Sequence, residues 1–207
     1  MKRITKSELF MYVIGAFVAC LLISNVMAAK QFQIGPLILT SGAILFPVVY
    51  IINDVLAEIY GFKRARKVIF LGFALNAFAV AAYGLGILLP APGYATVASD
   101  AFAMVLGNTW RVLLASFAAY LAGSLSNAYI MERMKGKSGL MARCVTSTLV
   151  GEGLDGIIFV SVAFIGLLPA EAILTMIAGQ IIFKTGVEII LYPVTKSVIE
   201  KVRALPE

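Results

Sequence analysis

The segment 46–61, FPVVYIINDVLAEIYG, decides what kind of fold this chain can form. It is apolar, yet it carries Asn53, Asp54 and Glu58 and is followed at once by a run of basic residues. A carboxylate at the centre of a membrane-spanning helix costs roughly 2.5–3.5 kcal/mol, whereas each Leu or Ile returns only about 0.5 kcal/mol. Because Asp54 and Glu58 are four residues apart, a helix would place both on one face, with Tyr50 one turn further along it. We expect this face to line a site for a solute.

The composition extends this interpretation to the whole chain. Of the 207 residues 61% are hydrophobic and 14% charged, and the mean hydropathy is +0.96, well outside the range of soluble domains. The formal net charge is +6, but the basic residues form short clusters between apolar segments, which is typical of cytoplasmic loops and not of a nucleic-acid-binding surface. Cys20 and Cys144 lie in or beside apolar segments, and the chain has no histidine, so we expect packing residues, no metal site and no cofactor.

The sequence therefore predicts an all-α integral membrane protein that forms one membrane domain over residues 1–207. Six segments are long enough to cross the roughly 30 Å hydrocarbon core of a bilayer. The expected helices cover residues 9–29, 41–60, 68–89, 109–131, 142–168 and 170–195, and a short helix at the membrane surface covers 99–107. A cleavable signal peptide is the alternative for the first segment, but the length of that segment favours a spanning helix. The basic clusters alternate along the chain so that both termini are expected in the cytoplasm.

Six ionisable residues lie well within these segments: Asp54, Glu58, Glu152, Asp155, Lys184 and Glu188. Facing lipid unpaired, they would cost roughly 15–20 kcal/mol, so we expect them to face the interior of the bundle. Lys184 and Glu188 are four residues apart, which makes an ion pair within one helix available. The remaining carboxylates outnumber this lysine, so some must hold a proton or bind hydrogen-bond donors of a solute. A protonatable acid in the pathway would also allow proton coupling.

Two further patterns concern the organisation of the helices. Residues 151–156 read G-x-G-x-x-G, but a dinucleotide site needs a preceding strand and a βαβ unit, so glycines that permit close helix packing are the better interpretation. Helices one to three and four to six form halves of opposite orientation, each with an acidic pair in its middle helix. That arrangement is typical of a 3+3 inverted repeat with a site at the midplane.

Short motifs along the whole chain have a familiar combination. They are Ser24-Asn25, Ala29-Lys30, Phe46-Pro47, Asn53-Asp54, Glu58, Tyr60-Gly61, Arg64-Ala65-Arg66, Asn76, Pro90, Pro92, Leu106-Gly107, Arg111, Ser147-Thr148, Gly151, Asp155, Gly179-Gln180, Phe183-Lys184 and Glu188. Together they resemble the queuosine-precursor transporter family of the vitamin-uptake-transporter group. The chain departs from that pattern at Ser124 and Asn127, where many relatives have Gln and Asp, and at Glu152, where Gln or Asn is common. These departures bear on which substrate is preferred.

The resemblance implies six helices and uptake of a 7-deazaguanine across the bacterial inner membrane. The substrate would be 7-cyano-7-deazaguanine, 7-aminomethyl-7-deazaguanine or the base queuine, and the chain would be no enzyme. By the same resemblance, Asn53, Asp54, Asp155, Gln180 and Lys184 match positions expected to line the site. The full set of candidate substrate-binding residues is Tyr50, Asn53, Asp54, Glu58, Glu152, Asp155, Gln180, Lys184 and Glu188.

The chemistry of the candidates agrees with such a ligand. A guanine-like edge presents adjacent N–H donors that one carboxylate accepts together, while its carbonyl oxygen needs a donor such as Lys, Asn or Gln. A secondary transporter is the leading hypothesis. The alternative is a substrate-binding membrane subunit of an ATP-driven importer, which would need partner subunits because the chain has no nucleotide-binding motif. An intramembrane enzyme is a third, weaker hypothesis. A homo-oligomer is compatible with the sequence.

Overall fold

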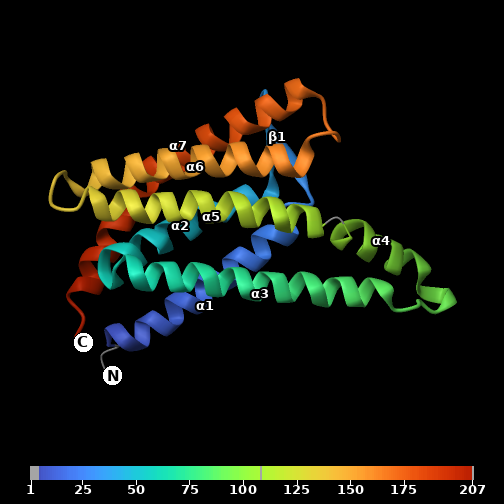
Figure 1. Ribbon diagram of the computed structural model, residues 1–207, viewed down its shortest axis with the longest axis horizontal. Helices are drawn as coiled ribbons and strands as arrows, with labels where there is room; N and C mark the ends of the chain where they lie inside the picture. Colours follow the sequence, from blue (N-terminus) through green and yellow to red (C-terminus); the bar gives the residue numbers. More distant parts are fainter. Residues whose placement is uncertain (1–4, 108, 207) are drawn as a thin grey trace.

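The computed structural model describes residues 5–107 and 109–206, apart from the side chains of Phe46, Tyr50 and Glu188. It is a helical bundle with one short hairpin (Figure 1). The elements are α1 (Lys6–Met27), β1 (Gln31–Ile34), β2 (Leu37–Thr40), η1 (Ser41–Ile44), α2 (Phe46–Val55), η2 (Leu56–Tyr60), α3 (Phe62–Leu88), η3 (Gly93–Ala95), α4 (Thr96–Leu106), α5 (Thr109–Arg133), α6 (Leu140–Phe164) and α7 (Ala170–Arg203).

Six helical segments in the described part of the chain are long and apolar enough to cross a membrane, which confirms the predicted fold class. They are Lys6–Met27, Ser41–Tyr60, Phe62–Leu88, Gly93–Arg133, Leu140–Phe164 and Ala170–Val187. Large apolar side chains point outward from them, among them Phe78, Leu88 and Met104, each at least 72% exposed. A water-soluble protein does not expose apolar side chains on this scale, whereas lipid would cover them. The inverted repeat stays a prediction.

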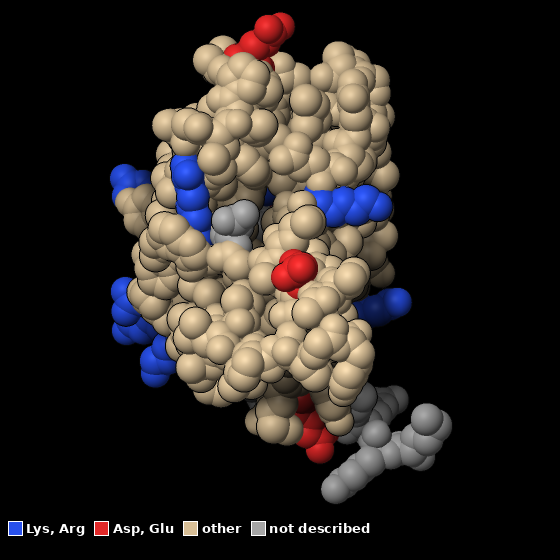
Figure 2. Space-filling view, turned by 90° about the vertical axis from the view of Figure 1, so that its right-hand side faces the viewer, with Lys and Arg blue, Asp and Glu red and all other residues tan. Residues whose placement is uncertain are grey.

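The two ends of the chain lie together at one end of the bundle (Figure 1). The Lys6 amide donates to the carbonyl of Pro206 at 2.8 Å. A chain that crosses a membrane an even number of times has both ends on the same side. The cytoplasmic location of both termini stays a prediction. Figure 2 views the molecule from the right-hand side of Figure 1, the end away from the termini, and uncharged side chains form most of that face.

The hydropathy pattern misplaced several boundaries, and each difference has a local cause. The turn expected at 30–39 is the antiparallel hairpin of β1 and β2, in which Gln31 faces Thr40. The basic run expected as a loop is the first turn of α3, because Gly61 at φ 82° ends one helix and starts the next directly. The last helix continues eight residues past the expected 195, since its extension buries Ile199 and Val202. Conversely, α6 ends at residue 164 and not at 168.

The second spanning segment is irregular, where a single helix was expected. It begins as the 3₁₀ turn η1, continues as α2 and ends as η2, which is a π-helix. Gly42 brings η1 against α1, since a Cβ there would lie only 2.4 Å from the carbonyl oxygen of Ser24. Short π-helical segments are rare and often occur at functional sites. The segment 99–107 is helical, as expected, within α4. The position of α4 at the membrane surface stays a prediction.

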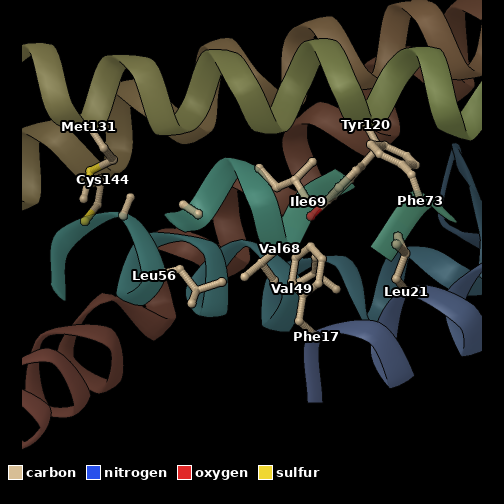
Figure 3. Close-up of a cluster of buried hydrophobic side chains, with 12 residues drawn as sticks. Phe17, Leu21, Val49, Leu56, Val68, Ile69, Phe73, Tyr120, Met131 and Cys144 are labelled. Carbon is tan, nitrogen blue, oxygen red and sulfur yellow. The ribbon is translucent and has the colours of Figure 1, made fainter. Parts of the chain in front are cut away.

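A hydrophobic core holds α1, α2, α3, α5 and α6 together (Figure 3). Tyr120 of α5 packs against Phe17 and Phe73, with ring centroids 5.9 and 5.1 Å apart. Cys144 is fully buried in this core beside Met131, which agrees with a packing role. The core occupies one side of the interior, and polar side chains occupy the space among α2, α5, α6 and α7.

Candidate functional site

Eight buried polar side chains from α2, α5, α6 and α7 form what we call the polar cluster. Helix α2 packs against both α5 and α7, and α6 packs against the same two helices, so the four surround a common interior. Each member of the cluster is at most 2% exposed: Asn53, Asp54, Asn127, Thr148, Glu152, Asp155, Gln180 and Lys184. Buried polar groups on this scale are costly in a membrane protein, and they mark functional sites more often than packing.

Lys184 lies at the centre of the ion pairs in this cluster. Its Nζ donates to Asp155 Oδ2 at 2.8 Å and lies 2.8 Å from Glu152 Oε2. The two acids are three residues apart, so one face of α6 presents both to α7. The sequence suggested a pair between Lys184 and Glu188 instead. In the structure the Lys184 ammonium contacts the two acids of α6. The side chain of Glu188 lies outside the described residues.

A second group within the cluster joins α2 to α5. The Nδ2 of Asn127 donates to Asp54 Oδ1 at 3.3 Å. Asn127 was not a candidate from the sequence reasoning, although it is a polar residue in the apolar span 109–131. Thr148 was missed as well, although it belongs to one of the motifs of the family resemblance. The side chain of Tyr50, which was expected beside Asp54, lies outside the described residues.

Several polar atoms of the cluster have no hydrogen-bond partner among the described residues. They are both amide atoms of Asn53, Oδ1 of Asn127, Oγ1 of Thr148 and Nε2 of Gln180. An unsatisfied buried polar group costs about 1–3 kcal/mol, so proteins rarely keep several of them together. The set includes donors and acceptors, and it comes from the same four helices as the polar cluster. It therefore offers unused hydrogen-bonding capacity to a polar molecule that enters this interior.

Glu58 belongs to a different group of charges, near the termini. Its carboxylate accepts from Arg143 of α6, with Nη1 3.2 Å from Oε2, and from Arg203 of α7. Lys135 also donates to the Glu58 carbonyl at 3.3 Å. The sequence placed Glu58 on the same solute-binding face as Asp54. Glu58 lies in the π-helical turn η2, and its carboxylate joins η2 to α6 and α7 in what we call the terminal ion network.

The sequence led us to expect that the carboxylates line a site for a solute, and this stays a prediction. The polar cluster is closed, because Lys184 occupies the space between the acids and no member is accessible to water beyond 2% of its surface. A cavity of about 330 Å³ lies elsewhere, toward the end of the bundle away from the termini.

The G-x-G-x-x-G segment lies inside the continuous helix α6, with Gly156 against Ile181 of α7. The residues directly before it are therefore helical and do not form the strand that a dinucleotide site needs.

Comparisons with known proteins give the same family as the sequence motifs. A family model described as "Putative vitamin uptake transporter" matches residues 40–198. A "Probable queuosine precursor transporter" of Bacillus subtilis is 28% identical over 196 residues, which are 93% of this chain and 83% of that protein. A protein of the same description from Haemophilus influenzae is 26% identical over 129 residues, 60% of this chain and 52% of that protein. No solved structure matches the chain.

Proposed function

Because the chain belongs to the vitamin uptake transporter family, we propose that it carries a queuosine precursor, a 7-deazaguanine, across the bacterial inner membrane into the cell. The family is one of transporters, which agrees with the prediction that the chain is not an enzyme. The names of the two relatives support the substrate class. The observation that carries the proposal in this chain is the polar cluster, with its three carboxylates and its unpartnered amide and hydroxyl atoms.

The chemistry of the cluster suits the pyrimidine edge of a deazaguanine. That edge presents an amino group and a ring N–H side by side, and a carboxylate accepts both together. Asp155 is the best candidate for this role, because Lys184 stays paired with Glu152 when Asp155 turns to the ligand. The lactam oxygen of the ring needs a donor, and Nε2 of Gln180 is one that has no partner among the described residues.

The closed cluster implies that binding requires rearrangement. A ring cannot enter while Lys184 fills the space between Glu152 and Asp155, so the ligand must take over hydrogen bonds that the lysine makes. Such an exchange of bonds makes binding of the ligand and opening of the cluster one coupled event. A carrier that works by alternating access needs this coupling, since the site must not be open to both sides at once.

We favour a secondary transporter driven by the proton gradient. Asp54, Glu152 and Asp155 with Lys184 have a formal charge of −2 when all are ionised, and a proton carried with the substrate would reduce this charge inside the bundle. The alternative is a membrane subunit that binds the substrate for a separate ATPase. With both termini in the cytoplasm, as the basic clusters predict, the end of the bundle shown in Figure 2 faces outward.

Uptake by the purified chain alone distinguishes these mechanisms. Proteoliposomes that contain only this protein are loaded at pH 7.5, diluted to an outside pH of 6.0 or 7.5, and given radiolabelled 7-cyano-7-deazaguanine. Accumulation that requires the proton gradient supports the secondary transporter, and competition by 7-aminomethyl-7-deazaguanine, queuine and guanine ranks the substrates. Binding to the purified protein without uptake favours the ATP-driven importer. Absence of both binding and uptake for all the deazaguanines refutes the proposed function.

A further inference from the structure

The cavity of about 330 Å³ lies away from the polar cluster, where the far end of α1 meets the start of α5 and the end of α6. Its polar and aromatic lining is formed by Asn25, Gln31, Thr109, Trp110, Arg111 and Phe164. This end of the bundle is opposite the termini (Figure 1). The volume is at the lower limit of the roughly 300–1,000 Å³ of small-molecule sites, which suits a ligand no larger than a bicyclic ring.

Asn25 is the feature that marks the cavity as a binding site. Its side chain is 9% exposed, and Nδ2 has no hydrogen-bond partner among the described residues. A buried amide donor without a partner costs about 1–3 kcal/mol, which a ligand that supplies an acceptor would recover. Packing does not require an amide at this position of an otherwise apolar helix, in which a Leu of similar volume would carry no such cost.

Arg111 gives the same wall of the cavity a fixed positive charge. Its Nε donates to the carbonyl of Val162 at 3.1 Å and its Nη2 to that of Ile165 at 2.6 Å, at the end of α6. These bonds hold the guanidinium plane in place and leave further N–H groups available, since a guanidinium has five. Neither Asp nor Glu is among the described residues that line the cavity. The lining therefore favours ligands that present acceptor atoms.

Trp110 adds a flat aromatic surface to this set of donors. Planar heterocycles stack on indole rings, and the face of a tryptophan contributes to binding whatever the substituents of the heterocycle are. A stacking surface, an unpartnered amide donor and a guanidinium together suit a planar ring with a carbonyl or nitrile at its edge. This chemistry is the opposite of that of the polar cluster, whose carboxylates suit the donor edge of a ring.

We propose that this cavity is a second binding site, where a planar heterocycle from outside the cell first binds by its acceptor edge before it passes to the polar cluster. The inference rests on the proposed function for the identity of the heterocycle and for the direction of transport. The polar cluster takes the donor edge of the same molecule after the ligand has left the cavity.

The experiment uses Trp110, which is the only tryptophan of the chain, as its probe. Purified protein in lipid nanodiscs is titrated with 7-cyano-7-deazaguanine, and the change in tryptophan fluorescence is corrected for absorption with free N-acetyltryptophanamide. We expect a saturable change in the wild type. The Asp155→Asn variant, altered only in the polar cluster, should show the same change at the same concentration while its uptake into proteoliposomes falls.

Two comparisons test the chemistry of the site. The Asn25→Leu variant should need about tenfold more ligand for half the change, because one hydrogen bond is lost. The second uses the wild type and does not depend on the folding of a variant: 7-deaza-2-aminopurine, which lacks the 6-oxo group of 7-deazaguanine, should bind about tenfold more weakly than 7-deazaguanine. Equal affinity for both compounds in the wild type overturns the acceptor-edge assignment.

The failure of this inference is distinct from the failure of the proposed function. If the wild type transports the deazaguanine but Trp110 shows no saturable change, the cavity is not a binding site although the function holds. The same conclusion follows if the change is lost together with uptake in Asp155→Asn, because the fluorescence would then report the polar cluster. If a change in lipid headgroup alone reproduces the signal, Trp110 is a membrane anchor and the inference is wrong.

Discussion

Replacing Asp155 with Asn should weaken the binding of 7-cyano-7-deazaguanine to the polar cluster about 10- to 150-fold, leave its binding in the cavity beside Asn25 unchanged and leave a folded protein in the membrane. A hydrogen bond to a charged group contributes roughly 1.5–3 kcal/mol, and each 1.4 kcal/mol is a factor of ten in affinity. The stability of the protein should change little, because Lys184 has a second carboxylate partner. Lys184 contacts two carboxylates at 2.8 Å, so the ammonium remains paired with Glu152 in the variant.

The amide oxygen of the new Asn side chain can still accept from Lys184, so the variant leaves no buried charge without a partner. The loss of stability should be about 1 kcal/mol, well below the roughly 3–5 kcal/mol that follows when a buried ion loses its only partner. The matched control is Asp100→Asn, the same chemical change at an exposed position of α4.

Equilibrium binding of the radiolabelled ligand to protein in nanodiscs measures the affinity, and thermal unfolding of the same samples measures the stability. Asp100→Asn should match the wild type in both. If Asp155→Asn binds as many ligand molecules as the wild type and with the same affinities, the assignment of this carboxylate to the donor edge of the ligand is refuted. A variant that loses affinity only because it no longer folds would show that Glu152 does not compensate Lys184, which is equally contrary to the reasoning.

Three other predictions concern packing and charge away from the polar cluster. Gly42→Ala should lower the stability by about 1–3 kcal/mol, because its Cβ would clash with α1, whereas Gly15→Ala, which has open space around it, should not; thermal unfolding in detergent compares the two. Arg143→Ala should lower the melting temperature more than Arg203→Ala does, because the side chain of Arg143 is 8% exposed and that of Arg203 is 53% exposed. The reverse order would mean that burial does not set the strength of the terminal ion network. Cys144→Ser should lose some stability but keep its uptake activity, and complete loss of uptake by folded protein would assign a role to the thiol.

The sequence was sufficient to predict the spanning segments and the burial of Asp54, Glu58, Glu152 and Asp155. Both follow from the large free-energy cost of polar groups in lipid, which depends on composition and not on the arrangement of neighbours. The irregular second segment was not predictable in the same way. A 3₁₀ turn, an α-helix and a π-helix have the same hydropathy, and the choice among them depends on the close contact of Gly42 with α1 and on the pairing of Glu58.

The sequence also did not predict the partners of the buried charged residues. Local spacing suggested that Lys184 pairs with Glu188 one turn away, because contacts at i and i+4 are the ones that a single helix fixes. Its partners in the structure are Glu152 and Asp155, on another helix. Asn127 was missed for a related reason. One amide in a span has no visible partner until the packing of α5 against α2 brings it to Asp54.

The buried acids differ in the cations that they contact. Glu58 has two guanidinium partners, so its oxygens are satisfied, and its removal from the network would leave two arginines with fewer bonds. Glu152 and Asp155 share one ammonium, and Asp54 accepts from the amide of Asn127. A carboxylate has about four sites that accept hydrogen bonds, so acids that share a donor retain capacity for others. Glu58 thus has two guanidinium partners, from α6 and α7, whereas Asp155 shares the ammonium of Lys184 with Glu152, and we expect a donor-rich ring to meet Asp155.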